Sequence, residues 1–224
     1  MNRLVILGLF GLLAASPAAA QTVTGGYGGY QRIARGVFEL GLDNLLLVRQ
    51  GTQKLGSGDD DVSTLEIAYT GGLTPRYFIA DNFALGLSVG FFVRKQTATT
   101  KVGSTETETI LADDSGVIGF LMANYYIRLG NSFFFKPGIG AGGFTGTRSL
   151  PVAGTTDQKV ESALAGAAVR ADLGFAFFAS QHMNLRAGLD FVYRSGSDTP
   201  DGADEGQDFS TIDGGFNIGI GYLF

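Results

Sequence analysis

Residues 210–224 read STIDGGFNIGIGYLF, and their alternate positions behave as two different sequences. The even positions are mostly large and apolar, whereas the odd positions from 211 to 221 are all small or polar: Thr, Asp, Gly, Asn, Gly and Gly. Successive side chains of a β-strand point to opposite faces, so this two-residue period predicts a strand with one bulky apolar face. That face carries Ile212, Gly214, Phe216, Ile218, Ile220, Tyr222 and Phe224.

The same alternation recurs in seven earlier segments, so the sequence predicts eight strands. These segments are residues 36–49, 65–76, 83–95, 116–129, 133–148, 163–178 and 185–194. The connections alternate between three short ones and four long polar ones, namely residues 79–82, 128–132 and 179–184 against 50–61, 96–115, 149–160 and 195–209. Short periplasmic turns and long external loops are typical of outer-membrane barrels, so we expect an all-β, eight-stranded antiparallel up-and-down transmembrane β-barrel with both termini in the periplasm.

Side-chain volume indicates which face of this barrel looks outward. A soluble barrel such as a lipocalin alternates in the same way, so the period alone does not decide. The interior of an eight-stranded barrel is barely wide enough for side chains. The bulky face must therefore point into lipid and the small face inward. A soluble sandwich with an aromatic core is the alternative interpretation.

Aromatic residues gather beside the short connections and at the C-terminus. We expect them to form an interfacial girdle at the periplasmic end of the barrel. They are Tyr77, Phe78, Phe83, Tyr125, Tyr126, Phe133, Phe134, Phe177, Phe178, Tyr222 and Phe224.

The N-terminus has the order of a secretory signal peptide: Arg3, an apolar run over residues 4–15, and an Ala-rich cleavage site before Gln21. The apolar run is shorter than the roughly 20 residues that a transmembrane helix needs. We therefore expect a signal peptide at residues 1–20, a periplasmic tail or frayed lead-in at 21–35, and an outer-membrane β-barrel domain at 36–224.

Composition excludes several function classes. The chain has no Cys, which rules out disulfides, thiol catalysis and Cys-ligated metals. The net charge of −5 removes any electrostatic case for nucleic-acid binding.

Charged residues at inward positions predict an ion-paired barrel interior. Six cations face six anions there, and groups in so narrow a space must pair because an unpaired buried charge costs several kcal/mol. The alternative interpretation is an ion pathway or gate. The predicted network is Glu39, Asp43, Glu66, Arg76, Arg94, Lys136, Arg170, Asp172, Arg186, Asp190, Arg194 and Asp213.

A basic residue ends each strand that runs toward the outside, and Arg49, Lys95 and Arg148 are candidates for binding lipopolysaccharide phosphates at that rim. The competing interpretation follows from strand parity. Arg49 and Arg148, with Arg94 and Arg194, would then point inward and cap the interior network, leaving Lys95 alone outside.

Three segments and the terminal GIGYLF are similar to the outer-membrane β-barrel domain family, with its OmpX-like and OmpA-type small, porin-like barrels of Gram-negative bacteria. The segments are LTPRYFIADNFALGLS at 73–88, YYIRLGNSFFFKPGIGAGG at 125–143 and GFAFFASQHMNLRAGL at 174–189. The resemblance implies the same fold, and it implies that Tyr222 and Phe224 form the signal read by the barrel-assembly machinery. It does not fix an activity, since family members differ in function.

No catalytic or metal site emerges from the residues. His182, the only histidine, falls in an expected periplasmic turn with no His-x-Ser sequence, so it is interpreted as a solvated turn residue. The acidic loops lack the spacing of an EF-hand. We expect a non-enzymatic barrel without cofactors, a monomer that meets lipid and lipopolysaccharide and acts structurally or through its external loops. A lipid A-modifying enzyme and a narrow channel remain the alternatives.

Overall fold

The computed structural model describes residues 33–55, 61–68, 72–102, 105–151, 159–203 and 205–224. The expected signal peptide at residues 1–20 and most of the lead-in lie outside these residues. The strands are β1 (Phe38–Leu55), β2 (Asp61–Ala68), β3 (Gly72–Ala80), β4 (Phe83–Val102), β5 (Thr105–Tyr125), β6 (Ile127–Arg128), β7 (Phe133–Pro151), β8 (Lys159–Phe178), β9 (Met183–Pro200) and β10 (Gln207–Leu223).

These strands close into a ring of eight. Both β2 and β3 pair with β1 on one side and β4 on the other, so they are two parts of one wall strand. In the same way β5 and β6 both pair with β7. The ring closes where β1 pairs with β10, and every pairing is antiparallel. The predicted eight-stranded antiparallel up-and-down barrel is confirmed.

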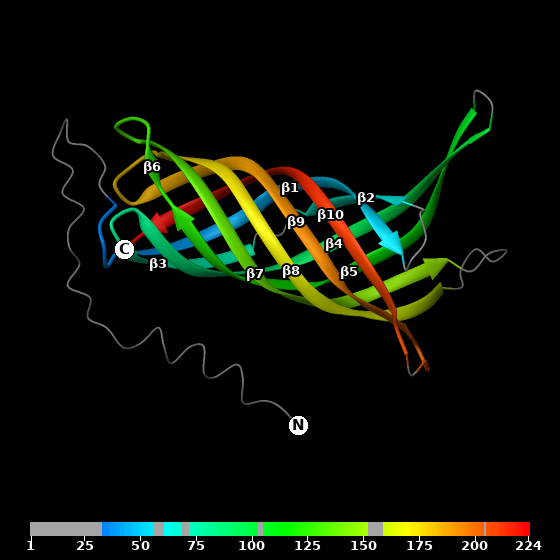
Figure 1. Cartoon of the computed structure of the whole chain (residues 1–224). Coiled ribbons are helices and arrows are strands. Elements are labelled where there is room, and N and C mark those ends of the chain that lie inside the picture. The colour runs from blue at the N-terminus through cyan, green and yellow to red at the C-terminus, as the bar shows by residue number, and fades with distance from the viewer. Residues whose placement is uncertain (1–32, 56–60, 69–71, 103–104, 152–158, 204) are drawn as a thin grey trace.

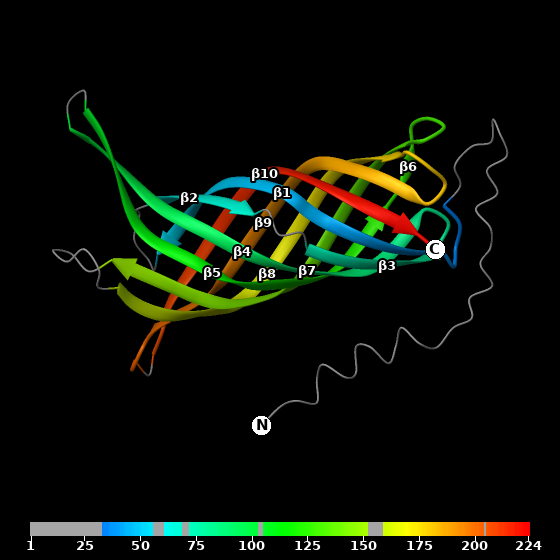
Figure 2. The ribbon, with the colours of Figure 1, turned by 180° about the vertical axis from the view of Figure 1, so that it is seen from behind.

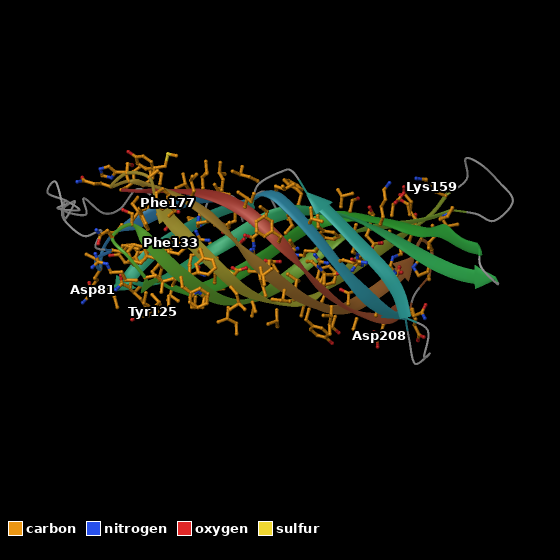
Figure 3. All side chains as sticks on the ribbon, turned by 90° about the horizontal axis from the view of Figure 1, so that it is seen from above. Asp81, Tyr125, Phe133, Lys159, Phe177 and Asp208 are labelled. Carbon is orange, nitrogen blue, oxygen red and sulfur yellow. The ribbon has the colours of Figure 1, made fainter. Side chains whose placement is uncertain are left out.

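The two ends of the barrel differ. Figure 1 shows the C-terminus and the three short turns at one end and the long hairpins at the other, and the view from behind in Figure 2 agrees. In Figure 3, Asp81, Tyr125, Phe133 and Phe177 mark the short-turn end. Lys159 and Asp208 mark the opposite, long-hairpin end.

The long connections were predicted as loops, and this was wrong for much of their length. The register of β4 and β5 continues beyond the predicted strand ends as far as the Val102–Thr105 pair. Likewise, β7 and β8 pair out to Pro151 and Lys159, and β9 and β10 to Asp198 and Gln207. Backbone pairing continues there because neighbouring strands hold the backbone extended even where the sequence is polar and has no apolar period.

The outer face of the ring is apolar and exposed. Phe91 and Leu121 each have 65% of their surface exposed, and the outward residues of β4 are apolar from Phe83 to Val93. For a rise of about 3.3 Å per residue and a tilt of about 40°, this belt is about 25 Å high, the height of the apolar band that outer-membrane barrels present to lipid. The next outward residue is Lys95, so the belt ends there.

Four aromatic doublets split between the two faces of the wall, which corrects the predicted girdle. Tyr77, Tyr125, Phe133 and Phe177 are exposed on the outside, where Tyr222 and Phe224 join them. Their neighbours Phe78, Tyr126, Phe134 and Phe178 point inward and are buried, because successive residues of a strand face opposite ways. The inward rings belong to what we call the base cluster, which comprises Ile33, Val37, Phe78, Ala84, Tyr126, Phe134, Ala176, Phe178 and Leu223.

The base cluster closes the barrel at its short-turn end. The rings of Phe134 and Phe178 meet edge to face with centroids 5.3 Å apart, and Phe134 meets Tyr126 at 6.4 Å. Ile33, from the described end of the predicted lead-in, is fully buried, and its carbonyl accepts a 3.0 Å hydrogen bond from the Asn82 amide. The segment before β1 is therefore part of the base.

Candidate functional site: the ion-paired interior

The ion pairs inside the barrel form three groups along its axis, and the lower group lies directly above the base cluster. Arg76 on β3 pairs with Glu39 at 2.9 Å and also with Asp43. Arg186 on β9 meets the same two carboxylates, at 3.2 and 2.7 Å. The Tyr126 hydroxyl donates a 2.9 Å hydrogen bond to Glu39. Two arginines thus neutralise two acids, and the group is tied to the base.

The middle group is centred on Arg170 of β8. Its Nε lies 2.8 Å from Asp172 and 2.6 Å from Asp190, so one guanidinium joins two neighbouring strands. Arg49 of β1 also pairs with Asp190. Arg170, Asp190 and Arg49 are each at most 3% exposed, so these pairs are screened from solvent.

The upper group lies toward the long hairpins. Asp114 of β5 accepts from Arg94 at 2.5 Å and from Arg148 at 2.8 Å. Arg194 pairs with Asp213 at 2.7 Å, and that carboxylate lies 3.7 Å from Arg94. Arg148 also reaches Asp198 at 2.5 Å, in the part of β9 that extends beyond the apolar belt.

Aromatic rings fill the space between the upper charges. The guanidinium of Arg148 lies 5.2 Å from the ring centroid of Phe209, and that of Arg194 lies 5.2 Å from Phe92. At this distance a cation is attracted by the ring face. The inward face was expected to carry mainly small residues, and here that was wrong, because a second apolar cluster lies inside. Its residues are Phe92, Ile118, Phe120, Met122, Phe144, Leu164, Ala168, Val192 and Phe209.

The structure places eleven of the twelve predicted network residues inside the barrel. The side chain of Glu66 lies outside the described residues. Ten of the eleven take part in the ion pairs above, and Lys136 of β7 is buried without an ion-pair partner among the described residues. Sequence reasoning missed Asp114, which is fully buried, although its separation of eleven residues from Tyr125 mirrors that of Arg94 from Phe83.

The rim prediction is corrected for two of its three residues. Arg49 and Arg148 are 3% and 2% exposed and pair with interior carboxylates, as the parity interpretation required. Their predicted contact with lipopolysaccharide phosphates is therefore wrong, because their guanidinium groups lie inside the wall. Lys95 is exposed on the outer face. Its backbone is paired with Asp113, whose carboxylate lies 3.9 Å from the exposed Lys159 ammonium.

His182 lies in the turn between β8 and β9, as predicted. Its ring is exposed and stacks on Tyr222 with centroids 5.7 Å apart, while Nδ1 lies 3.0 Å from the Leu223 carbonyl. The nearby Ser180 Oγ accepts hydrogen bonds from the backbone amides of His182 and Met183. Among the described residues the Ser180 hydroxyl makes no hydrogen bond with the His182 ring, whose Nδ1 contacts the Leu223 carbonyl instead.

The described part of the chain holds neither a metal-binding cluster nor a membrane-spanning helix. No group of three or more His, Asp or Glu side chains there is arranged to hold a metal ion. No helix among the described residues has the length and apolar character to cross a bilayer.

A closed ring with an apolar outer belt, an ion-paired interior and an apolar base defines a small transmembrane β-barrel. Its architecture is similar to that of OprG of Pseudomonas aeruginosa, with 20% identity over 88% of this chain and 98% of that one and a TM-score of 0.47. AlkL, solved in lipid bilayers, is 12% identical over 90% of this chain and 94% of its own, with a TM-score of 0.48. The outer membrane protease OmpT of Escherichia coli is 7% identical over 87% of this chain and 98% of its own, with a TM-score of 0.39.

No protein-family model and no curated protein matches the sequence. The likenesses to solved structures are between folds, at low identity and with TM-scores below 0.5. They assign no activity to this chain, whose own interior and surfaces must carry the functional argument.

Proposed function

We propose that this chain is a non-enzymatic outer-membrane barrel that acts as a structural element or through its long external hairpins. The observation that carries this proposal is the filled interior. Three groups of ion pairs, a second apolar cluster and the base cluster occupy the barrel from end to end. Such an interior favours a rigid platform as the role of the barrel, rather than a water-filled channel.

The long hairpins supply the surface that a partner would meet. Their paired backbones extend beyond the belt, which fixes their shape more firmly than a loop would. Acids predominate among the accessible side chains of their described residues, namely the exposed Glu161, Asp201, Glu205 and Asp208 and the half-buried Asp113. This surface favours partners that carry positive charge or bound cations.

The outer rim is the proposed site of lipopolysaccharide contact. Lys95 ends the apolar belt on β4. The side chain of Lys159 on β8 is 58% exposed and lies beside Asp113, which is on β5 next to β4. Ammonium groups at this depth form charge-assisted hydrogen bonds with lipid phosphates. Replacing Lys95 with Gln should lower the melting temperature in lipopolysaccharide more than in phosphate-free detergent. Equal losses would count against the contact.

Export and assembly complete the proposal. We expect cleavage after the signal peptide at residues 1–20, recognition of Tyr222 and Phe224 by the barrel-assembly machinery, and a monomeric barrel in the membrane.

Two measurements test the proposed function against its alternatives. Purified barrel in planar bilayers should give no steady conductance, because the base cluster closes one end. The lipid A mass spectrum should be the same with and without the gene. A stable unitary conductance would favour the channel, and a gene-dependent change in acylation would favour the enzyme.

A further inference from the structure

A small cavity lies inside the barrel where the lower and middle ion-paired groups meet. Gly174 of β8 lines it at an inward position, and the residue paired with Gly174 on β9 is Gly188, so neither strand places a side chain there. The space corresponds to roughly one water molecule. The polar residues among those that line it are Asp43, Lys136, Arg170, Asp172, Arg186 and Asn217.

Lys136 differs from every other buried cation that the structure describes. Seven arginines are buried inside the barrel, and each has at least one carboxylate at ion-pair distance. Lys136 is 4% exposed and has none among the described residues. An ammonium carries three donors, and burying it without acceptors is costly. An acceptor other than a protein atom in direct contact would lower this cost.

A second donor at the cavity is also without an acceptor. The Nε atom of Arg186 is buried and makes no hydrogen bond, whereas Nη1 of the same group lies beside Glu39 and Asp43 and Nη2 donates to the Ile220 carbonyl. Asp43 and Asp172 provide carboxylate oxygens at the same cavity. Donors from two residues and acceptors from two others thus surround one small space.

We propose that this cavity is a binding site for one structural water molecule. The water accepts hydrogen bonds from Lys136 and Arg186 and donates to Asp43 and Asp172, which gives it the four partners that a buried water can use. A small anion such as chloride would meet the same donors, but the two carboxylates disfavour it. The bound water connects the lower group with Asp172 of the middle group, so the polar network becomes continuous through the barrel.

Diffraction from the full mature barrel tests the site directly, with crystals soaked in bromide as a probe for an anion. We expect one density peak within hydrogen-bond distance of the Lys136 ammonium and no bromide anomalous signal there. An anomalous peak at the site would replace the water with an anion. A Lys136 ammonium in direct contact with Asp43 or Asp172, without a separate peak, would also overturn the proposal.

A double-mutant cycle gives an independent test in solution. A Cβ atom on Gly174 would have its nearest contact at 3.5 Å, so Gly174→Ala places a methyl group beside the cavity without a clash and without changing a charge. We expect it to lower the urea midpoint in wild type by displacing the water. In Lys136→Met, where the main donor is gone, the same change should have a much smaller effect. Equal shifts in both backgrounds, including no shift in either, would refute the site.

The exposed residue Lys159 provides the matched control for the cycle. Its side chain lies at the long-hairpin end (Figure 3), and along β8 it is fifteen residues from Gly174 at the cavity. Lys159→Met removes the same charge, and Gly174→Ala should lower the urea midpoint in that background as much as in wild type.

Discussion

The hydroxyl of Tyr126 lies 2.9 Å from the Glu39 carboxylate, and this hydrogen bond joins the apolar base of the barrel to its ion-paired interior. Tyr126 is 1% exposed and Glu39 is fully buried, so water does not compete for the contact. The tyrosine ring packs on Phe78 and Phe134 in the base, while its oxygen reaches the lower group. One side chain therefore takes part in both halves of the packing.

Replacing Tyr126 with Phe should lower the free energy of unfolding by about 1–3 kcal/mol, because a buried carboxylate oxygen loses its donor while the ring contacts stay. Urea unfolding in lipid vesicles measures the change. Tyr125→Phe is the matched control, since the neighbouring ring lies on the outer face and should have little effect. Equal losses from the two substitutions would contradict the role of the hydrogen bond.

Arg170→Ala should be among the most destabilising changes inside the barrel. It leaves Asp172 without its ion-pair partner and Asp190 with only Arg49, and breaking a buried pair in this way costs about 3–5 kcal/mol. The urea midpoint of the variant, compared with that of Lys95→Ala on the outer rim, measures the effect. A wild-type midpoint for Arg170→Ala would mean that the interior pairs do not stabilise the barrel.

The adjacent residues Phe133 and Phe134 should respond differently to truncation. Phe134→Ala opens a cavity in the base cluster and should cost about 3–5 kcal/mol. Phe133→Ala removes an outward ring that stacks on Phe175 at 5.3 Å, and we expect about 1 kcal/mol. The comparison requires only two unfolding curves, and a larger loss at Phe133 would show that the inward and outward faces were exchanged.

Replacing the terminal Phe224 with Ala should reduce the amount of barrel that reaches the membrane, while the barrels that assemble keep their stability. Its ring is 61% exposed and contacts Phe38 and Tyr222 on the outer face, so little interior packing depends on it. Heat-modifiable migration on gels measures the assembled fraction, and urea unfolding measures the stability. Tyr193→Ala, another outward aromatic on β9, is the control for a general loss of surface rings. Normal assembly of the Phe224 variant would exclude the proposed signal.

Most of the architecture could be predicted from residue alternation, because period 2 fixes which residues of a strand share a face. That is how the inward positions of Arg76, Arg170 and Asp190 could be assigned without coordinates. Alternation fails where the wall is irregular. The register of β1 against β10 shifts between Leu42 and Leu46, and Asn44 within this bulge has a φ of 60°. Asn is among the residues that adopt this backbone conformation most readily, but the apolar alternation on either side of Asp43-Asn44 predicts one continuous strand and hides the bulge.

Ion-pair partners could not be predicted, for a different reason. Strand parity shows that a charged side chain points inward. It does not give the register shift between neighbouring strands, which sets the height of that side chain along the barrel axis. Arg49 and Asp190 are 141 positions apart in sequence and meet only because of the shifts around the whole ring. The aromatic doublets show a related limit, since proximity to a turn suggested a girdle for all of them and strand parity sent half of them inward.

The composition of the base cluster has a consequence for how the barrel is made. It combines Ile33 and Val37, which precede the first strand, with Leu223 near the end of the last strand and with rings from the hairpins between them. These contacts join residues from nearly the whole described chain. The base is therefore incomplete until β10, which carries Leu223, has been added. Closure of the base must therefore be a late and cooperative event. A chain stopped short of β10 would keep its inward rings uncovered, which marks it as unfinished to any factor that binds exposed aromatic surface.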